Sequence, residues 1–79
     1  MEVYLTRHAR NRMRLYKIME ADVKTTLEAP GEIVSGASGS EHAWRQITKN
    51  QWLRVTFKIE GNRKVVITVT PKNRRQEGE

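Results

Sequence analysis

The stretch Gln51-Trp-Leu-Arg-Val-Thr-Phe-Lys-Ile59 decides the fold of this chain, because apolar and polar side chains alternate along it without interruption. One parity is apolar and consists of Leu53, Val55, Phe57 and Ile59. The other parity is polar and basic and consists of Trp52, Arg54, Thr56 and Lys58. A period of two with β-branched and aromatic residues predicts a half-buried strand. The rest of the chain must therefore cover the first face and supply neighbours for the second.

The residues before this strand predict two helices. The first helix covers Arg7–Tyr16, with Thr6 as its N-cap, because a threonine hydroxyl can accept from backbone N–H groups of the first turn. Its buried stripe is expected to consist of Ala9, Met13 and Tyr16. The second helix covers Met19–Glu28 and ends before Pro30, because the residue before a proline avoids the helical region. Val3–Leu5 is a short strand or an extended lead-in.

The residues around the central strand predict an antiparallel meander. Further strands are expected over Glu32–Ala37, Glu41–Thr48 and Lys64–Thr70. The predicted fold class is therefore α+β, with two N-terminal helices packed on a four-stranded antiparallel sheet. We expect one domain over residues 1–72, followed by a frayed polar tail over residues 73–79.

Composition restricts the classes of function. The chain has 79 residues, no cysteine and only two histidines, His8 and His42, which lie far apart in sequence. A zinc site is not expected from this spacing, and no cofactor motif or phosphate-cradling glycine loop is present. No apolar run approaches the length of a membrane span or a signal peptide, so we expect a cytoplasmic protein.

The net charge is the most informative total. Fifteen Lys and Arg residues stand against nine Asp and Glu residues, which gives a formal charge of +6. A domain this basic favours a polyanionic partner, most often a nucleic acid. The alternatives are that the charge aids solubility or meets an acidic protein.

Turn lengths predict how the strands pair. A two-residue loop at Lys49–Asn50 would set Arg45 opposite Arg54. A three-residue loop over Gly61–Arg63 would set Ile59 opposite Val65, Phe57 opposite Ile67 and Arg54 opposite Thr70. The predicted result is a row of Arg45, Arg54 and Thr70, with Trp52 and Thr56 beside it and Lys58 further along. Two facing arginines repel unless an anion lies between them. Guanidinium groups bind phosphate in a bidentate manner, and Trp52 could stack a base.

The alternatives for this row remain open at this point. Arg45 and Arg54 could each pair with a glutamate, Trp52 could simply cover the edge of a small core, and a one-residue slip would move the row to the other face. His8 has two interpretations as well. It could act as a general acid or base with Arg12 holding a phosphate beside it, or it could pack the first helical turn. His42 shares the parity of Trp44 and is interpreted as structural.

The first helix carries a basic stripe formed by Arg7, Arg10, Arg14 and Lys17. Such a stripe is usually a solvated face. In a chain of this charge it could also extend a nucleic-acid footprint.

The segment Thr6-Arg-His-Ala-Arg-Asn-Arg-Met13, followed by Ile18, Asp22-Val23, Leu27 and Pro30, resembles a family of small uncharacterised prokaryotic proteins within the RelE/ParE-like toxin superfamily. The similarity continues through Ala43-x-Arg45, Leu53-Arg54-Val55 and Val65-Val-Ile-Thr-Val69 and covers nearly the whole chain to about Lys72. By this resemblance, motif positions are occupied by His8, Arg12, Met13 and Arg54, and Arg45 matches a position that is commonly basic.

The resemblance implies a RelE-like fold and a toxin of a type II toxin–antitoxin pair. Many toxins of this kind cleave mRNA, commonly on the ribosome, without a metal, and others act on DNA gyrase. An acidic antitoxin would be the protein partner. This chain departs from the pattern, because Lys17 and Met19 replace an arginine and a capping residue, and no Tyr or His follows Thr70.

Two functional hypotheses follow from these observations. The first is a metal-independent mRNA endoribonuclease, in which the catalytic candidates are Arg54, Arg45, His8 and Lys58. The nucleic-acid contacts are then expected from Arg12, Trp52, Thr70, Lys72, Arg7, Arg10 and Arg14. The second is a non-catalytic basic module of the same fold that binds RNA, DNA or a protein.

Overall fold

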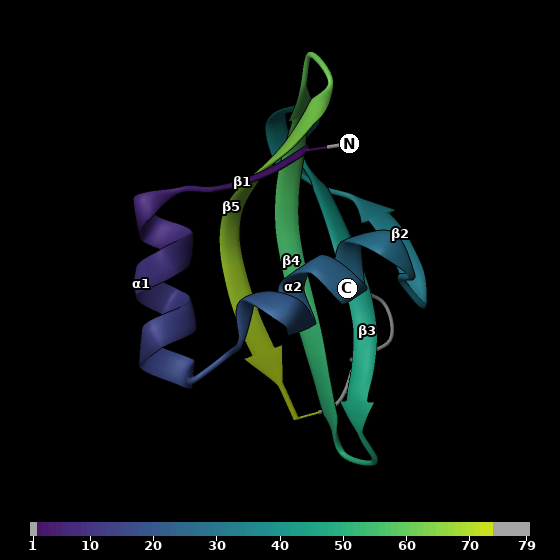
Figure 1. Cartoon of the computed structure of the whole chain (residues 1–79). Coiled ribbons are helices and arrows are strands. Elements are labelled where there is room, and N and C mark those ends of the chain that lie inside the picture. The colour runs from purple at the N-terminus through teal and green to yellow at the C-terminus, as the bar shows by residue number, and fades with distance from the viewer. Residues whose placement is uncertain (1, 74–79) are drawn as a thin grey trace.

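The computed structural model describes residues 2–73 and shows two helices and a five-stranded sheet (Figure 1). The helices are α1 (Arg7–Tyr16) and α2 (Glu20–Glu28), and a 3₁₀ turn, η1 (Ala37–Gly39), follows β2. The strands are β1 (Glu2–Leu5), β2 (Glu32–Ser35), β3 (Glu41–Thr48), β4 (Gln51–Glu60) and β5 (Arg63–Lys72). The predicted α+β class and the order of elements are confirmed. The tail expected after residue 72 lies almost wholly outside the described residues.

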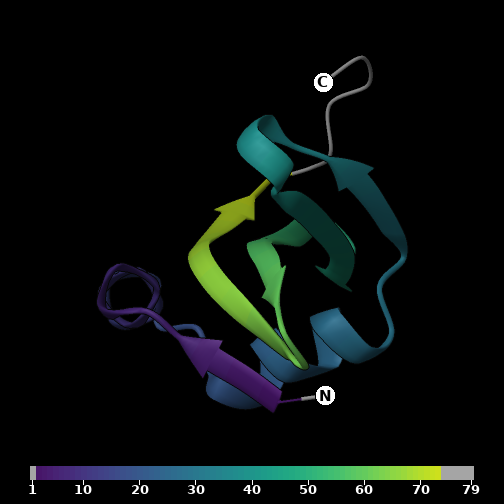
Figure 2. The same ribbon diagram turned by 90° about the horizontal axis from the view of Figure 1, so that it is seen from above.

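The strand order across the sheet is β1-β5-β4-β3-β2, with β4 at the centre as the alternating pattern predicts. The pairs β2–β3, β3–β4 and β4–β5 are antiparallel. The lead-in β1 is a strand that joins the far edge of β5 in parallel, so the sheet has five strands rather than the predicted four. Both helices then follow from the β1 end and lie against the sheet, as the view from above shows (Figure 2).

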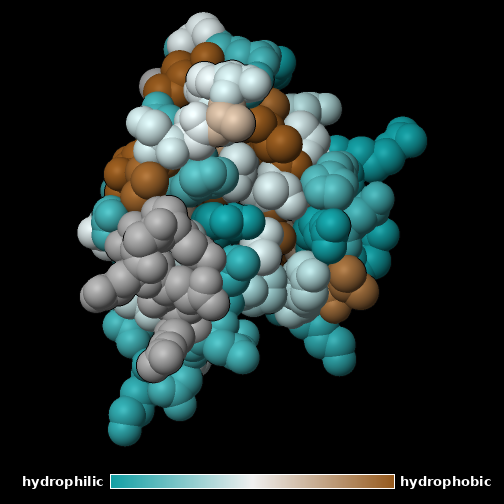
Figure 3. All heavy atoms as spheres, turned by 180° about the vertical axis from the view of Figure 1, so that it is seen from behind, coloured by the Kyte–Doolittle hydropathy of each residue, from teal (hydrophilic) through white to brown (hydrophobic). Residues whose placement is uncertain are grey.

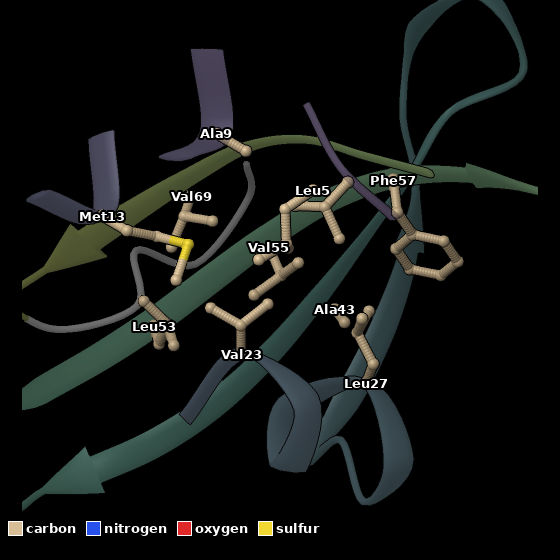
Figure 4. Close-up of a cluster of buried hydrophobic side chains, with 11 residues drawn as sticks. Leu5, Ala9, Met13, Val23, Leu27, Ala43, Leu53, Val55, Phe57 and Val69 are labelled. Atoms are coloured by element: carbon tan, nitrogen blue, oxygen red, sulfur yellow. The ribbon is translucent and has the colours of Figure 1, made fainter. Parts of the chain in front are cut away.

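The core lies between the helices and one face of the sheet (Figure 4). Strands β3, β4 and β5 contribute Ala43, Leu53, Val55, Phe57, Val66 and Val69, and β1 and the two helices contribute Leu5, Ala9, Met13, Val23 and Leu27. Of the four apolar residues of β4 that were predicted to face the core, Leu53, Val55 and Phe57 therefore do so. Ile59 is 52% exposed, because β4 continues past the part of the sheet that the helices cover. Tyr16 is also exposed, so the buried stripe of α1 is shorter than predicted.

Two bulges set the register of the sheet. Between β4 and β5, Thr56 pairs with Thr68 and Phe57 pairs with Val66, so Ile67 is the extra residue. Between β3 and β4, Thr48 pairs with Gln51 but Gln46 pairs with Trp52, so Ile47 is the extra residue. Each bulge shifts the pairing by one position, and such a shift exchanges the faces on which side chains lie.

No helix within residues 2–73 has the length and apolar character needed to span a membrane.

Candidate anion site on the rear face of the sheet

The rear face is the face of the sheet turned away from the helices, and it carries the polar parity of β4. Its central part is the rear-face cluster, which consists of His42 and Trp44 on β3, Arg54 and Thr56 on β4, and Thr68 and Thr70 on β5. Trp52, Lys58 and Lys72 extend the same face along β4 and β5. Hydrophilic and pale surface occupies the middle of this side, and hydrophobic surface gathers toward the end that holds the β4–β5 turn (Figure 3).

Arg54 lies at the centre of the rear face. Its strand partners are Trp44 on β3 and Thr70 on β5. The guanidinium carbon lies 5.7 Å from the centroid of the Trp44 ring, which makes a cation–π contact. Its Nε atom is enclosed by protein and has no hydrogen-bond partner within residues 2–73. Among the residues that the structure describes, Arg54 makes no ion pair.

This arrangement leaves a half-buried cation without an acceptor in the part of the chain that the structure describes. An enclosed donor without a partner costs about 1–3 kcal/mol, whereas a cation–π contact contributes about 0.5–2 kcal/mol depending on exposure. The two contributions roughly offset each other, so Arg54 adds little to the stability of the fold. Its remaining guanidinium N–H groups are not enclosed, because Nε is the only enclosed orphan atom among the described side chains. They are therefore available to an anion that reaches the rear face.

His42 stands beside Arg54, in the position diagonal to it across β3 and β4. Its Nδ1 atom lies 2.8 Å from Thr56 Oγ1 in a hydrogen bond. Burial lowers the pKa of His42 below its usual value, and the nearby charge of Arg54 lowers the pKa further. The imidazole is therefore neutral at pH 7, when it can accept a proton or a hydrogen bond.

Arg45 does not belong to this site, and the predicted row of Arg45, Arg54 and Thr70 is wrong in its first member. The bulge at Ile47 sets Arg45 opposite Leu53, on the face that packs against the helices. There its Nη1 donates to the carbonyl oxygen of Ala29 at 3.1 Å, at the end of α2. A cation at a helix C-terminus satisfies an orphan carbonyl and the helix dipole. The role that the structure gives to Arg45 is thus structural.

The pairing of Arg54 with Thr70 is as predicted, although the predicted turn is not. The β4–β5 loop has two residues, Gly61 and Asn62, so Ile59 pairs with Lys64 instead of Val65. Phe57 pairs with Val66 instead of Ile67 for the same reason. The bulge at Ile67 then takes up one residue of β5, and the predicted register resumes.

The candidates on α1 lie away from the rear-face cluster. His8 is exposed, and its Nε2 accepts from Arg12 Nε at 3.5 Å, while Arg12 Nη1 donates to Tyr16 at 3.3 Å. Neither residue lies near Arg54, because α1 packs at the side of β5 (Figure 2). The basic stripe is also exposed and consists of Arg7, Arg10, Arg14 and Lys17. It forms a second cationic surface rather than a part of the first.

Three further candidates share the rear face with Arg54. Trp52 is half-buried and pairs with Gln46 on one side and Lys72 on the other. Trp52 and Lys72, both predicted to contact nucleic acid, therefore lie together at one end of the rear-face cluster. Lys58 pairs with Val65 and lies toward the other end. These positions place cations on either side of Arg54 along β4 and β5.

Sequence reasoning did not place His42 and Trp44 beside Arg54, where the structure has them. Trp44 is buried and supports the guanidinium of Arg54. The signal that could have found them is Ala43, whose small apolar side chain fits beneath a helix and thus turns its two neighbours to the other face. Within residues 2–73, no group of three or more His, Asp or Glu side chains could hold a metal ion.

The fold and this face define a small basic α+β domain with a half-buried arginine at the centre of the rear face. The chain belongs to the family described as a domain of unknown function, DUF4258, which it matches over residues 5–71. No curated protein and no solved structure shows a significant match.

Proposed function

We propose that this protein binds single-stranded RNA through the rear face, with Arg54 as the residue that holds a backbone phosphate. The observation that carries the proposal is the half-buried guanidinium of Arg54, which has an enclosed Nε and no described hydrogen-bond or ion-pair partner. A charge kept out of water is costly unless an opposite charge meets it. A phosphate is suited to this role because the planar guanidinium fork matches its oxygens.

The surroundings of Arg54 support a nucleic-acid backbone as the source of that phosphate. Trp44 makes a cation–π contact with the guanidinium, and Thr70 occupies the strand position directly opposite Arg54. Lys58 and Lys72 lie on the same face and would meet neighbouring phosphates. Half-buried Trp52 is suited to stack an unpaired base, which favours a single strand over a duplex.

The experiment is a comparison of Arg54→Met with Arg45→Met in binding of a fluorescent single-stranded RNA of mixed sequence. Both variants remove one positive charge from the same sheet, but only Arg54 lies on the rear face. A charged hydrogen-bond contact contributes about 1.5–3 kcal/mol, so Arg54→Met is expected to raise Kd about 10- to 100-fold. Arg45→Met, checked for folding by circular dichroism, should bind nearly as wild type. Equal affinities for wild type and Arg54→Met would overturn the proposal.

A finer proposal is that the domain is a metal-independent endoribonuclease toxin of the RelE/ParE-like kind, with ribosome-bound mRNA as substrate and an acidic antitoxin as partner. The observation that favours it is His42, an imidazole held on the strand position diagonal to the phosphate-binding group. In this reaction the 2′-oxygen forms a bond to the adjacent phosphorus and its proton passes to water. The bond from phosphorus to the 5′-oxygen breaks, protonated His42 gives its proton to the leaving oxygen, and Arg54 stabilises the developing charge.

Cleavage is tested separately from binding. Labelled RNA is incubated with the protein in EDTA, and the products are examined for 2′,3′-cyclic phosphate ends. The wild type should cut RNA, whereas His42→Gln should bind but not cut, and a strand with 2′-deoxyribose at each position should stay intact. Growth after induced expression should arrest for the wild type and not for Arg54→Met. Intact RNA and undisturbed growth at verified expression would rule out the toxin while leaving the binding proposal standing.

A further inference from the structure

His42 is held on the rear face from two sides. On one side, Thr56 on β4 makes the 2.8 Å hydrogen bond to Nδ1. On the other side, the loop between β2 and β3 closes against the ring. A Cβ added to Gly36 would lie 2.7 Å from His42 Nε2 and 2.6 Å from Ser40 Oγ. The imidazole therefore packs closely against Gly36, where a larger residue would have to displace it or Ser40.

The Nε2 atom of this ring is unused within the fold. Nδ1 makes the one hydrogen bond of the side chain to a described residue. Nε2 is not enclosed, because Arg54 Nε is the only atom among the described side chains that is both enclosed and unpartnered. The fold therefore leaves one ring nitrogen of His42 unpartnered and not fully enclosed, on the residue diagonal to Arg54.

Charged groups on neighbouring elements determine how readily this ring becomes a cation. The adjacent strand β4 presents Arg54 and Lys58 on the same face, diagonal to His42 on either side of Thr56. The strand β2 presents Glu32 on that face, opposite Trp44. The loop over residues 36–40 contains no titratable side chain, and β5 presents Thr68 beyond Thr56. Two cations thus stand nearest along β4, and burial adds to their effect.

We propose that His42 is a second phosphate-binding residue of the Arg54 site, which contacts the anion as an imidazolium, so that RNA binding takes up one proton. This inference rests on the proposed function and adds a residue and a pH dependence to it. A bound phosphate neutralises the charge of Arg54 and offers an acceptor to Nε2–H. Both changes favour the protonated ring, so the pKa of His42 rises when the anion binds. By linkage, affinity rises as the pH falls.

The test measures the affinity for a fluorescent oligouridylate between pH 5.5 and pH 8 at constant ionic strength. Uridine has no group that gains a proton in this range, so the change in affinity reports the protein. One coupled proton gives at most about a tenfold gain in affinity per pH unit. The wild type should bind more tightly as the pH falls, and His42→Gln should bind with an affinity that hardly changes. His8→Gln, which removes the other histidine, should behave as wild type.

The outcomes separate the two proposals. Binding that is lost in Arg54→Met but does not vary with pH in the wild type overturns the role of His42 and keeps that of Arg54. A pH dependence of binding that persists in His42→Gln also overturns the proposed role of His42. Absence of binding at every pH overturns the proposed function and this inference with it. Should His42→Gln fold poorly, NMR titration of the wild-type His42 ring decides, because a pKa that does not rise with saturating RNA contradicts the proposal.

Discussion

The hydroxyl of Thr6 lies 2.9 Å from the carbonyl oxygen of Val66, a residue 60 positions further along the chain. The hydroxyl oxygen of Thr6 also accepts from the backbone N–H of Ala9 at 3.1 Å and so caps α1. The same hydroxyl lies 3.2 Å from the carbonyl oxygen of Ile67, which is the extra residue of the β4–β5 bulge. One side chain therefore begins the first helix and fastens it to the last strand at the point where the register shifts.

Substitution of Thr6 should cost more stability than substitution of a half-buried threonine usually does. Thr6→Val keeps the shape of the side chain but removes both the cap and the donor to β5. An N-cap contributes about 0.5–2 kcal/mol, and a buried hydrogen bond about 1 kcal/mol, so we expect a loss of about 1.5–3 kcal/mol in the free energy of unfolding. Urea denaturation measures it. Thr6→Ser retains the hydroxyl and should recover most of the loss, whereas equal losses in the two variants would refute this account.

Gly36 should be intolerant of the smallest side chain for a steric reason. Its φ of −112° is available to any residue, but a Cβ would meet Ser40 Oγ and His42 Nε2 at less than 3 Å. Overpacking costs about 1–3 kcal/mol, and relief of the clash must displace the ring of His42. Gly36→Ala should therefore lose stability and also shift the NMR signals of His42.

The matched control is Gly39→Ala in the same loop. Gly39 has φ of 79° and open space around its Cα, so alanine there strains the backbone but touches nothing. It should cost about 1 kcal/mol or somewhat more and leave the His42 signals in place. A His42 ring that moves equally in both variants would contradict the steric explanation.

The sequence was sufficient to predict the elements and the central strand but not every residue that shares its polar face. The pattern of β4 assigns Arg54 to the polar parity without reference to any neighbour, and this assignment is confirmed. Its partners depend on the register, which a bulge can shift without a clear sequence signal. The β4–β5 turn is one residue shorter than predicted, but the bulge at Ile67 restores the predicted pairing of Arg54 with Thr70. The bulge at Ile47, in contrast, sets Trp44 instead of Arg45 opposite Arg54.

The cost of two facing arginines was the one physical warning against the predicted row. Like charges directly opposite each other destabilise a sheet. The fold avoids this cost by turning Arg45 toward the C-terminus of α2, which has no basic residue in its last turn. Lys64 does the same from β5, because its Nζ donates to the carbonyl oxygen of Leu27 at 3.2 Å. Cations from the sheet thus supply the charge that the helix itself lacks.

The two arginines should consequently have opposite effects on stability. Arg45→Met removes the hydrogen bond to Ala29 and the favourable charge at the helix end, and should lower the free energy of unfolding by about 0.5–1.5 kcal/mol. Arg54→Met removes an enclosed orphan donor and should leave stability unchanged or raise it. Thermal unfolding followed by circular dichroism compares them. A loss in Arg54→Met as large as that in Arg45→Met would show that Arg54 is a structural residue.

The pH dependence of stability should report His42 in the protein without RNA. Because the pKa of His42 is lowered in the folded state, the unfolded chain binds a proton first as the pH falls below about 6.5. Unfolding then takes up protons, so stability contributed by neutral His42 is complete above pH 6.5 and is lost as the pH falls toward the folded pKa. Denaturant midpoints measured from pH 8 to pH 5 should decrease for the wild type. His42→Gln should show a flatter profile over this window than His8→Gln, and identical slopes in the two variants would contradict the assignment.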